Sequence, residues 1–179
     1  MPEGIELPEE HHEPGDHPLV LPVSITISIM AVLVAGVTLL GHRAHTEELL
    51  RQSQAADKWA QYQAKSVRLH ETQGFSDVVN LIAAMDQGKG EALREKYLNE
   101  VEHYQSDKED ISKEARDLEA ERNFAGRKAD RFDAGEAFLE IGLVICSITL
   151  LTKRKGFWLA GMVLGAGGIV LAATGLLLG

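Results

Sequence analysis

The residues most able to do chemistry stand where an apolar run of the sequence gives way to a charged one. His42, His45 and Glu48 follow the first apolar run at spacings of three, which places them on one face of a helix. Glu136 and Glu140 stand four apart at the start of a second apolar run and also share a face. Because imidazole and carboxylate groups bind zinc, iron and manganese, these five residues are candidate ligands of a metal or proton site at a membrane boundary.

An electrostatic interpretation competes with this one. In a functional site the partner of Glu140 would be His42 or Arg43. Helix ends at a membrane surface also attract polar residues, so Glu140 could instead be neutral or paired with Arg43 alone. The inward Glu-x-x-His pattern of di-iron helix bundles needs more carboxylates, on four helices, and is absent. We therefore favour the electrostatic interpretation and expect no resident cofactor.

Catalytic signatures are missing from the sequence. It contains no Walker loop, no Gly-x-Ser-x-Gly elbow, no His-Glu-x-x-His and no Cys-x-x-Cys. Residues 1–18, rich in proline and acids, predict a disordered tail in which His11, His12 and His17 offer only a weak case for metal capture. We expect no catalytic residue and a protein that is not an enzyme.

Three apolar segments predict three membrane-spanning helices. They cover residues 19–41, 134–151 and 157–178, and each is long enough to cross a hydrocarbon core of about 30 Å. The segment 42–133 between the first two is charged and predicted to be helical. The expected fold is therefore all-α, with three transmembrane helices and a long antiparallel, coiled-coil-like helical hairpin between the first and the second.

Two of the spans carry stripes of small residues, which let helices approach closely in lipid. Such stripes pack either within one chain or between chains, and both possibilities stay open at this point. The stripe in the third span is Gly161, Gly165, Gly168, Ala172 and Gly175, and the stripe in the first is Ser24, Ser28, Ala31, Ala35 and Thr38.

Within the hairpin we expect a first helix reaching Gln73, a short helix over residues 75–85, a turn at residues 86–90 and a long helix from about Glu91. Trp59 and Tyr62 are expected to contact the short helix, another part of the hairpin or another subunit. The long helix has a seven-residue repeat, typical of a coiled-coil seam. Its members are Tyr97, Tyr104, Ile111, Leu118, Ala125 and Phe132, with Val101, Lys108, Ala115, Arg122 and Ala129 offset by four. The facing stripe is expected to be Leu49, Ser53, Ala56, Ala60, Ala64 and Val67.

Charge limits the partners and gives conflicting signals about topology. With 27 acidic and 18 basic residues and a net charge of −9, the chain is not expected to bind nucleic acid. The short basic turn at residues 153–155 favours a hairpin outside the cytoplasm, whereas the basic residues at the hairpin base favour one inside it. We expect a multi-pass membrane protein with a cytoplasmic hairpin.

The sequence also resembles a known family. "LLGHRAHTEELL" is followed by "DKWAQYQAKSVR" and later by two apolar segments split by "LTKRKGFW". The residues that carry the likeness are His42, His45, Asp57, Trp59, Tyr62, Gln63, Ala64 and Lys65. From Leu19 onward the chain resembles a bacterial inner-membrane family catalogued as a domain of unknown function, DUF4337. The resemblance implies a location in the inner membrane and no established activity.

The sequence favours a non-enzymatic scaffold or assembly protein, because it offers surfaces for association and lacks a catalytic constellation. Its partners would be membrane lipid and either a second copy or another membrane protein. The interaction surfaces would include Trp59, Tyr62, Gly161, Gly165 and Gly168. The alternative function is a proton- or metal-linked transporter or sensor that uses the histidine and glutamate residues.

Overall fold

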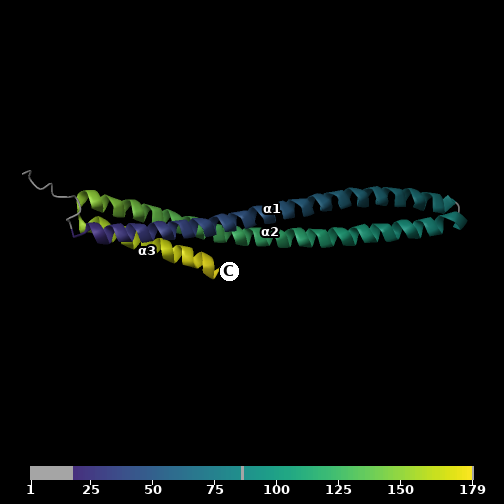
Figure 1. Cartoon of the computed structure of the whole chain (residues 1–179). Helices are drawn as coiled ribbons and strands as arrows, with labels where there is room; N and C mark the ends of the chain where they lie inside the picture. Colours follow the sequence, from purple (N-terminus) through teal and green to yellow (C-terminus); the bar gives the residue numbers. More distant parts are fainter. Residues whose placement is uncertain (1–17, 86, 179) are drawn as a thin grey trace, which may run out of the picture. The chain divides into compact units, whose positions relative to one another are not determined.

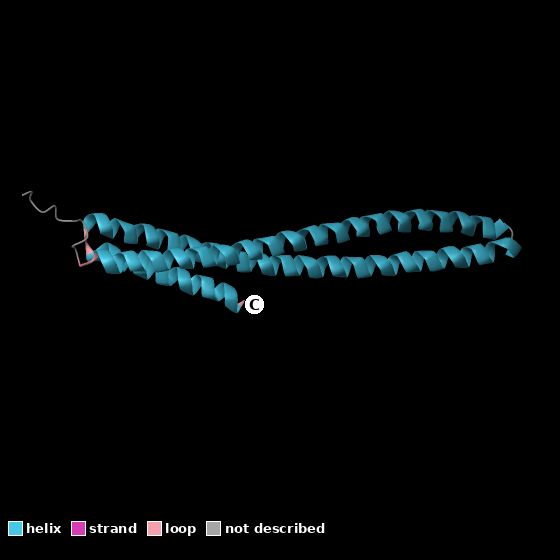
Figure 2. Ribbon diagram, in the orientation of Figure 1, coloured by secondary structure: helices cyan, strands magenta, loops and turns pink. Residues whose placement is uncertain are grey.

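The computed structural model describes residues 18–85 and 87–178, and every regular element in these ranges is a helix (Figure 2). Helix α1 spans Val20–Met85, α2 spans Gln87–Thr152 and α3 spans Lys155–Leu177 (Figure 1). Each contains a stretch long and apolar enough to cross a membrane. The predicted all-α class is confirmed; the predicted tail, apart from Pro18, lies outside the described residues.

The chain folds into two compact units, which are described separately. Of the described residues, the three-helix unit comprises 18–42 and 128–178, and the hairpin unit comprises 43–85 and 87–127. In the three-helix unit the beginning of α1, the end of α2 and the whole of α3 pack together. In the hairpin unit the rest of α1 and α2 lie side by side and run in opposite directions (Figure 1).

The core of the three-helix unit combines apolar side chains with glycines. Met30, Leu139 and Cys146 are buried, and Trp158 is among the half-buried side chains packed against them. The Trp158 indole donates a hydrogen bond to the Thr26 hydroxyl at 3.2 Å, so the polar edge of the ring is satisfied inside the unit.

The small-residue stripe of α3 is buried along its whole length, and it packs within the chain. Its partner is a stripe on α2 that includes two glycines, Gly135 and Gly142, which sequence reasoning overlooked. A Cβ added at Gly142 would lie 2.8 Å from the carbonyl oxygen of Gly161, and one at Gly168 would lie 2.6 Å from that of Gly135. The two helix backbones are therefore in contact, as small residues permit in lipid. The buried α3 residues are Gly161, Gly165, Gly168, Ala172 and Gly175.

The small-residue stripe predicted for the first span is not the face that α1 uses in this unit. Ser28, Ala31 and Ala35 are exposed, and only Ser24 and Thr38 are half-buried. Larger side chains fill the core instead, because α2 and α3 already approach closely through glycine and leave room beside them. The inward residues of α1 include Val23, Ile27, Met30, Val34 and Val37.

In the hairpin unit the seam predicted on α2 is confirmed. Every predicted seam residue of α2 in the hairpin unit is buried or half-buried, and Ala115 and Ala125 are nearly inaccessible. The stripe predicted on α1 is wrong, because its members are exposed; Leu49 is 66% and Val67 is 58% accessible. The α1 residues that lie toward α2 are instead Ala55, Lys58, Tyr62, Lys65, Leu69, Thr72, Ser76 and Val79.

The predicted break at Gly74 is also wrong, since α1 runs through it to Met85. One glycine in a helix costs only about 1 kcal/mol relative to alanine, which packing on both sides of it can offset. The short helix predicted over residues 75–85 is thus the end of α1. The apolar residues of this segment are divided, with Val79 buried toward α2 and Phe75, Val78 and Ile82 exposed. Helix α2 begins at Gln87, four residues earlier than expected.

Candidate functional site

The five candidate metal ligands divide between the two units. In the three-helix unit, Glu136 Oε1 accepts a hydrogen bond of 2.6 Å from the Thr38 hydroxyl. In the hairpin unit, His45 Nδ1 lies 3.5 Å from Glu48 Oε2, and both side chains are partly exposed. His42, Glu136 and Glu140 belong to the three-helix unit, and His45 and Glu48 belong to the hairpin unit.

Within residues 18–85 and 87–178, no three side chains of His, Cys, Asp or Glu gather closely enough to hold a metal ion. The metal site is thus not observed as a cluster among these residues, and it stays a prediction. Glu140 is exposed on α2, inside the segment predicted to cross the membrane. A carboxyl group at such a place is costly, which makes it a candidate for handling a proton or for pairing with another molecule.

The hairpin unit contains a feature that sequence reasoning missed, a ladder of three ion pairs between α1 and α2. The cations stand at seven-residue intervals on α1 and the acids at seven-residue intervals on α2. The pairs are Arg51 Nε with Glu121 Oε2 at 3.1 Å, Lys58 Nζ with Glu114 Oε2 at 2.5 Å, and Lys65 Nζ with Asp107 Oδ2 at 2.5 Å.

The ladder defines the register of the hairpin. Seven residues forward on α1 match seven residues back on α2, as an antiparallel pair without a slip requires. Each pair is partly exposed, so each adds only about 0.2–1 kcal/mol. Their effect is on specificity, because a shift of one residue would separate all three pairs at once. The signal was present in the sequence as two series of charges, Arg51, Lys58, Lys65 and Asp107, Glu114, Glu121.

The last pair has the clearest electrostatic consequence. The hydrogen bond from Lys65, together with the nearby charges of His103 and Lys65, lowers the pKa of the Asp107 carboxyl below its ordinary value, although burial acts in the opposite direction. The His103 ring lies 3.6 Å from the same carboxylate. Lys65 Nζ also lies 5.2 Å from the ring centroid of Tyr104, within the range of a cation–π contact.

Trp59 and Tyr62, predicted as interaction residues, make contacts within the hairpin unit. The Trp59 indole donates a hydrogen bond to Glu119 Oε1 at 2.9 Å. The two rings meet edge to face with centroids 5.5 Å apart, and Lys108 Nζ lies 5.0 Å from the Tyr62 centroid. Both side chains therefore help to join α1 to α2. This is the predicted alternative in which they contact another part of the hairpin.

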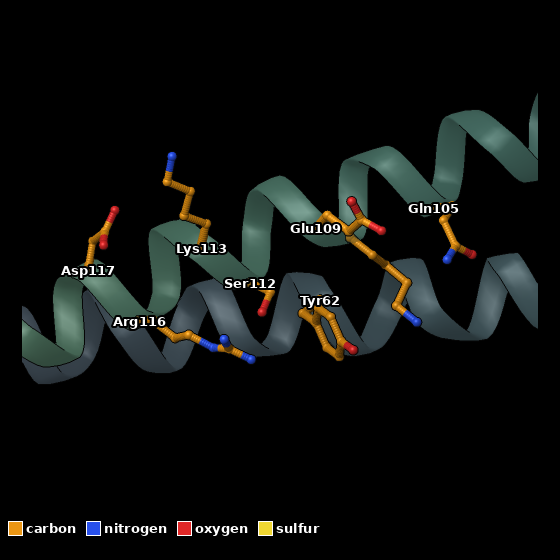
Figure 3. Close-up of a pocket in the computed structure, with 8 residues that line it drawn as sticks. Tyr62, Gln105, Glu109, Ser112, Lys113, Arg116 and Asp117 are labelled. Carbon is orange, nitrogen blue, oxygen red and sulfur yellow. The ribbon is translucent and has the colours of Figure 1, made fainter.

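A groove of about 470 Å³ runs along the hairpin beside Tyr62. Figure 3 shows Arg116 and Ser112 of α2 extending to the side on which Tyr62 lies, whereas Lys113 and Asp117 point away from it. The lining residues of the groove are Tyr62, Gln105, Lys108, Glu109, Ser112, Lys113, Arg116 and Asp117.

Comparison with protein families identifies a family for this chain. The model of the family described as "Domain of unknown function (DUF4337)" matches residues 21–178, which include nearly the whole of all three helices. The chain belongs to DUF4337. This confirms the resemblance, and the matched range begins after the acidic tail. No curated protein and no solved structure matches the chain.

In this DUF4337 chain the residues that carry the resemblance divide between two faces of α1. Trp59, Tyr62 and Lys65 contact α2 through the interactions described above. Gln63 and Ala64, which stand between them in the sequence, are exposed. The motif therefore combines a register-defining face with an outward one.

Proposed function

We propose that this DUF4337 protein is a non-enzymatic scaffold of the bacterial inner membrane, in which the hairpin holds a partner protein. The proposal combines three helices able to cross a membrane with a long hairpin of mixed charge. It assigns the three-helix unit to anchoring and the hairpin unit to binding. The hairpin lies in the cytoplasm in this account, as the basic residues at its base favour.

The observation that carries the proposal is an exposed apolar surface near the end of α1. Phe75, Val78, Leu81 and Ile82 are 61%, 52%, 70% and 56% accessible, although the Phe75 ring also stacks on Tyr97 with centroids 6.2 Å apart. Four large apolar side chains within eight residues form a contiguous patch, since spacings of three, four and seven share a helix side. Patches of this kind mark sites of protein association.

A photo-crosslinking residue at Val78, in the full-length protein in its native membrane, tests the proposal. We expect one discrete protein adduct from Val78, and none from Asn80, a nearby exposed polar position on the same helix. A Leu81→Glu change elsewhere in the patch should abolish the Val78 adduct. Adducts to lipid alone, or equal adducts from both positions, would contradict the scaffold role.

A second candidate function is proton- or metal-linked transport or sensing. Two observations favour it, namely the hydrogen bond between Thr38 and Glu136 and the exposure of Glu140 within a predicted span. Metal analysis of the purified protein tests the metal version, since stoichiometric metal that disappears in a His42→Ala/His45→Ala variant would support it. For the proton version, the protein in lipid vesicles should show pH-dependent transport, and Glu140→Gln should abolish it.

A further inference from the structure

The groove beside Tyr62 contains two cations that the scaffold function does not use. Arg116 and Lys108 both line it, and Lys108 Nζ lies 5.0 Å from the centroid of the Tyr62 ring. Figure 3 shows the Arg116 side chain on the side of α2 where Tyr62 lies. Two positive charges are therefore present on one side of the groove.

Three acids of α2 beside the groove are engaged by other donors. Asp107, Glu114 and Glu119 each bind a side chain of α1. Their partners, in that order, are Lys65, Lys58 and Trp59. Within the part of the chain that the structure describes, neither Arg116 nor Lys108 forms an ion pair. The two cations of the groove thus lack a paired counter-charge.

The charged residues that line the groove form two rows along α2. Residues four apart share a side of a helix, and the next residue along the chain points in a different direction. The row on the Tyr62 side has two cations and no acid, whereas the second row has two acids and one cation. In Figure 3 the labelled Lys113 and Asp117 of the second row point away from Tyr62. The first row is Lys108, Ser112 and Arg116, and the second is Glu109, Lys113 and Asp117.

The length of the first row selects an elongated anion. Lys108 and Arg116 are eight residues apart, which corresponds to about 12 Å along the helix axis. A compact anion such as a single phosphate meets one of these cations, whereas a chain of linked phosphates has charge along its length and meets both.

The donors of the first row also suit phosphate oxygens. Arginine and lysine bind them through charge-assisted hydrogen bonds, and arginine does so with two parallel N–H groups. Ser112 adds a hydroxyl donor halfway between the two cations. The groove volume of about 470 Å³ has room for several linked phosphates.

We propose that the groove binds an oligophosphate chain, with Arg116 and Lys108 at its two ends and the Ser112 hydroxyl between them. The site lies wholly within the hairpin unit. It goes beyond the scaffold function and does not depend on a partner at the end of α1. Because the chain has a net charge of −9, its overall field repels polyanions, so binding depends on the local positive charge of this row.

Isothermal titration calorimetry of the full-length protein in detergent tests the proposal, with inorganic tripolyphosphate as the probe and no divalent cation present. We expect one tripolyphosphate per chain. Arg116→Gln and Lys108→Gln should each weaken its binding about tenfold, because each removes a charge-assisted contact. Absence of tripolyphosphate binding to the parent protein overturns the proposal.

Lys113→Gln is the matched control. It removes the same charge from the same helix, but from the row that points away from Tyr62. Tripolyphosphate binding should stay within about twofold of the parent, since a charge that makes no contact is screened by salt. A loss equal to that of Arg116→Gln would show a general effect of charge and would overturn the proposal.

Two other anions test the chemical class of the ligand. Inorganic phosphate should bind at least about tenfold more weakly than tripolyphosphate, because it meets one cation instead of two. Citrate should also bind more weakly. Equal affinity for either anion would contradict recognition of an oligophosphate chain.

A stability measurement separates loss of binding from loss of folding. Arg116 is exposed and forms no ion pair among the described residues, so Arg116→Gln should melt at the temperature of the parent protein. Lys108→Gln also removes the contact with the Tyr62 ring. If it melts earlier, the result for Arg116→Gln decides, and unchanged tripolyphosphate binding in that variant overturns the proposal.

Discussion

At the scale of single residues, the hairpin unit is defined by charges that pair across two helices. Arg51, Lys58 and Lys65 repeat every seven residues, and their acidic partners on α2 repeat in reverse order. The charges were visible in the sequence, but one sequence does not tell whether a charged side chain faces water or another helix. Lysine and arginine can lie on an interhelical face because their aliphatic stems pack while their charged ends reach its edge.

A charge swap should show that the pairs act between the helices. Lys58→Glu brings two acids together at Glu114, and we expect it to lower the free energy of unfolding by about 1 kcal/mol. Adding Glu114→Lys should restore most of the loss. Thermal unfolding in detergent, followed by far-UV circular dichroism, measures both changes. Lys96→Glu is the control, because the Lys96–Glu100 pair lies within α2; a comparable loss there would contradict an interhelical effect.

The ion pair of Asp107 should make the stability of the hairpin depend on pH. Because the folded state lowers the pKa of this carboxyl, its stabilising effect is complete above the unfolded value, about 3.9, and is lost as the pH falls through the lower folded value. Asp107→Asn should therefore lower the melting temperature at pH 6. At a pH below both values, the variant and the parent should melt together. A difference that persists there would show that the carboxylate's charge is not the cause.

At the scale of elements, the apolar helices could be predicted and the faces of α1 could not. The uncharged apolar segments correctly predicted α3 and the apolar part of α1. The large residues of the α2 seam face inward, as expected. For α1 we expected small residues to receive the large ones of α2. The structure places Lys58, Tyr62 and Lys65 there instead, because their ion pairs and ring contacts satisfy polar groups that a small stripe would leave without partners.

The continuity of α1 through Gly74 leads to a prediction about two glycines. A Cβ at Gly74 would meet no atom within 4 Å, whereas one at Gly90 would lie 2.6 Å from the Cα of Ala83. Gly74→Ala should therefore stabilise the hairpin by about 1 kcal/mol, because alanine favours a helix more than glycine does. Gly90→Ala should destabilise it. Chemical denaturation of the full-length protein measures both, and a stabilising Gly90→Ala would contradict the close approach of α1 and α2.

The packing of α3 can be tested with neighbouring glycines. Gly168→Ala drives a methyl group against the Gly135 carbonyl and should cost about 1–3 kcal/mol, whereas Gly167→Ala meets open space and should be close to neutral. The buried thiol of Cys146, which α3 covers at Gly161, reports the change. Its labelling by a maleimide in detergent should become faster in Gly168→Ala only. Equal rates in both variants would contradict backbone contact between α2 and α3.

At the scale of the whole molecule, we propose that this DUF4337 protein crosses the membrane with its three apolar helices and holds the hairpin in water. Three spans require the hairpin and the turn between α2 and α3 to lie on opposite sides of the membrane. The signals of charge disagree about which side is cytoplasmic, and we assign the hairpin to the cytoplasm. The proposed binding surface at the end of α1 depends on this arrangement.

Cysteine accessibility in intact cells tests this claim most directly. In a Cys146→Ser background, single cysteines are placed at Glu95 in the hairpin and at Gly156 beside the turn, both exposed positions that leave the basic turn residues in place. With a membrane-impermeant thiol reagent, we expect Gly156→Cys to be labelled in intact cells and Glu95→Cys only after lysis. Labelling of both cysteines from the same side of the membrane would contradict a hairpin held in water by three membrane helices. So would a Glu95→Cys variant that stays unlabelled both in intact cells and after lysis.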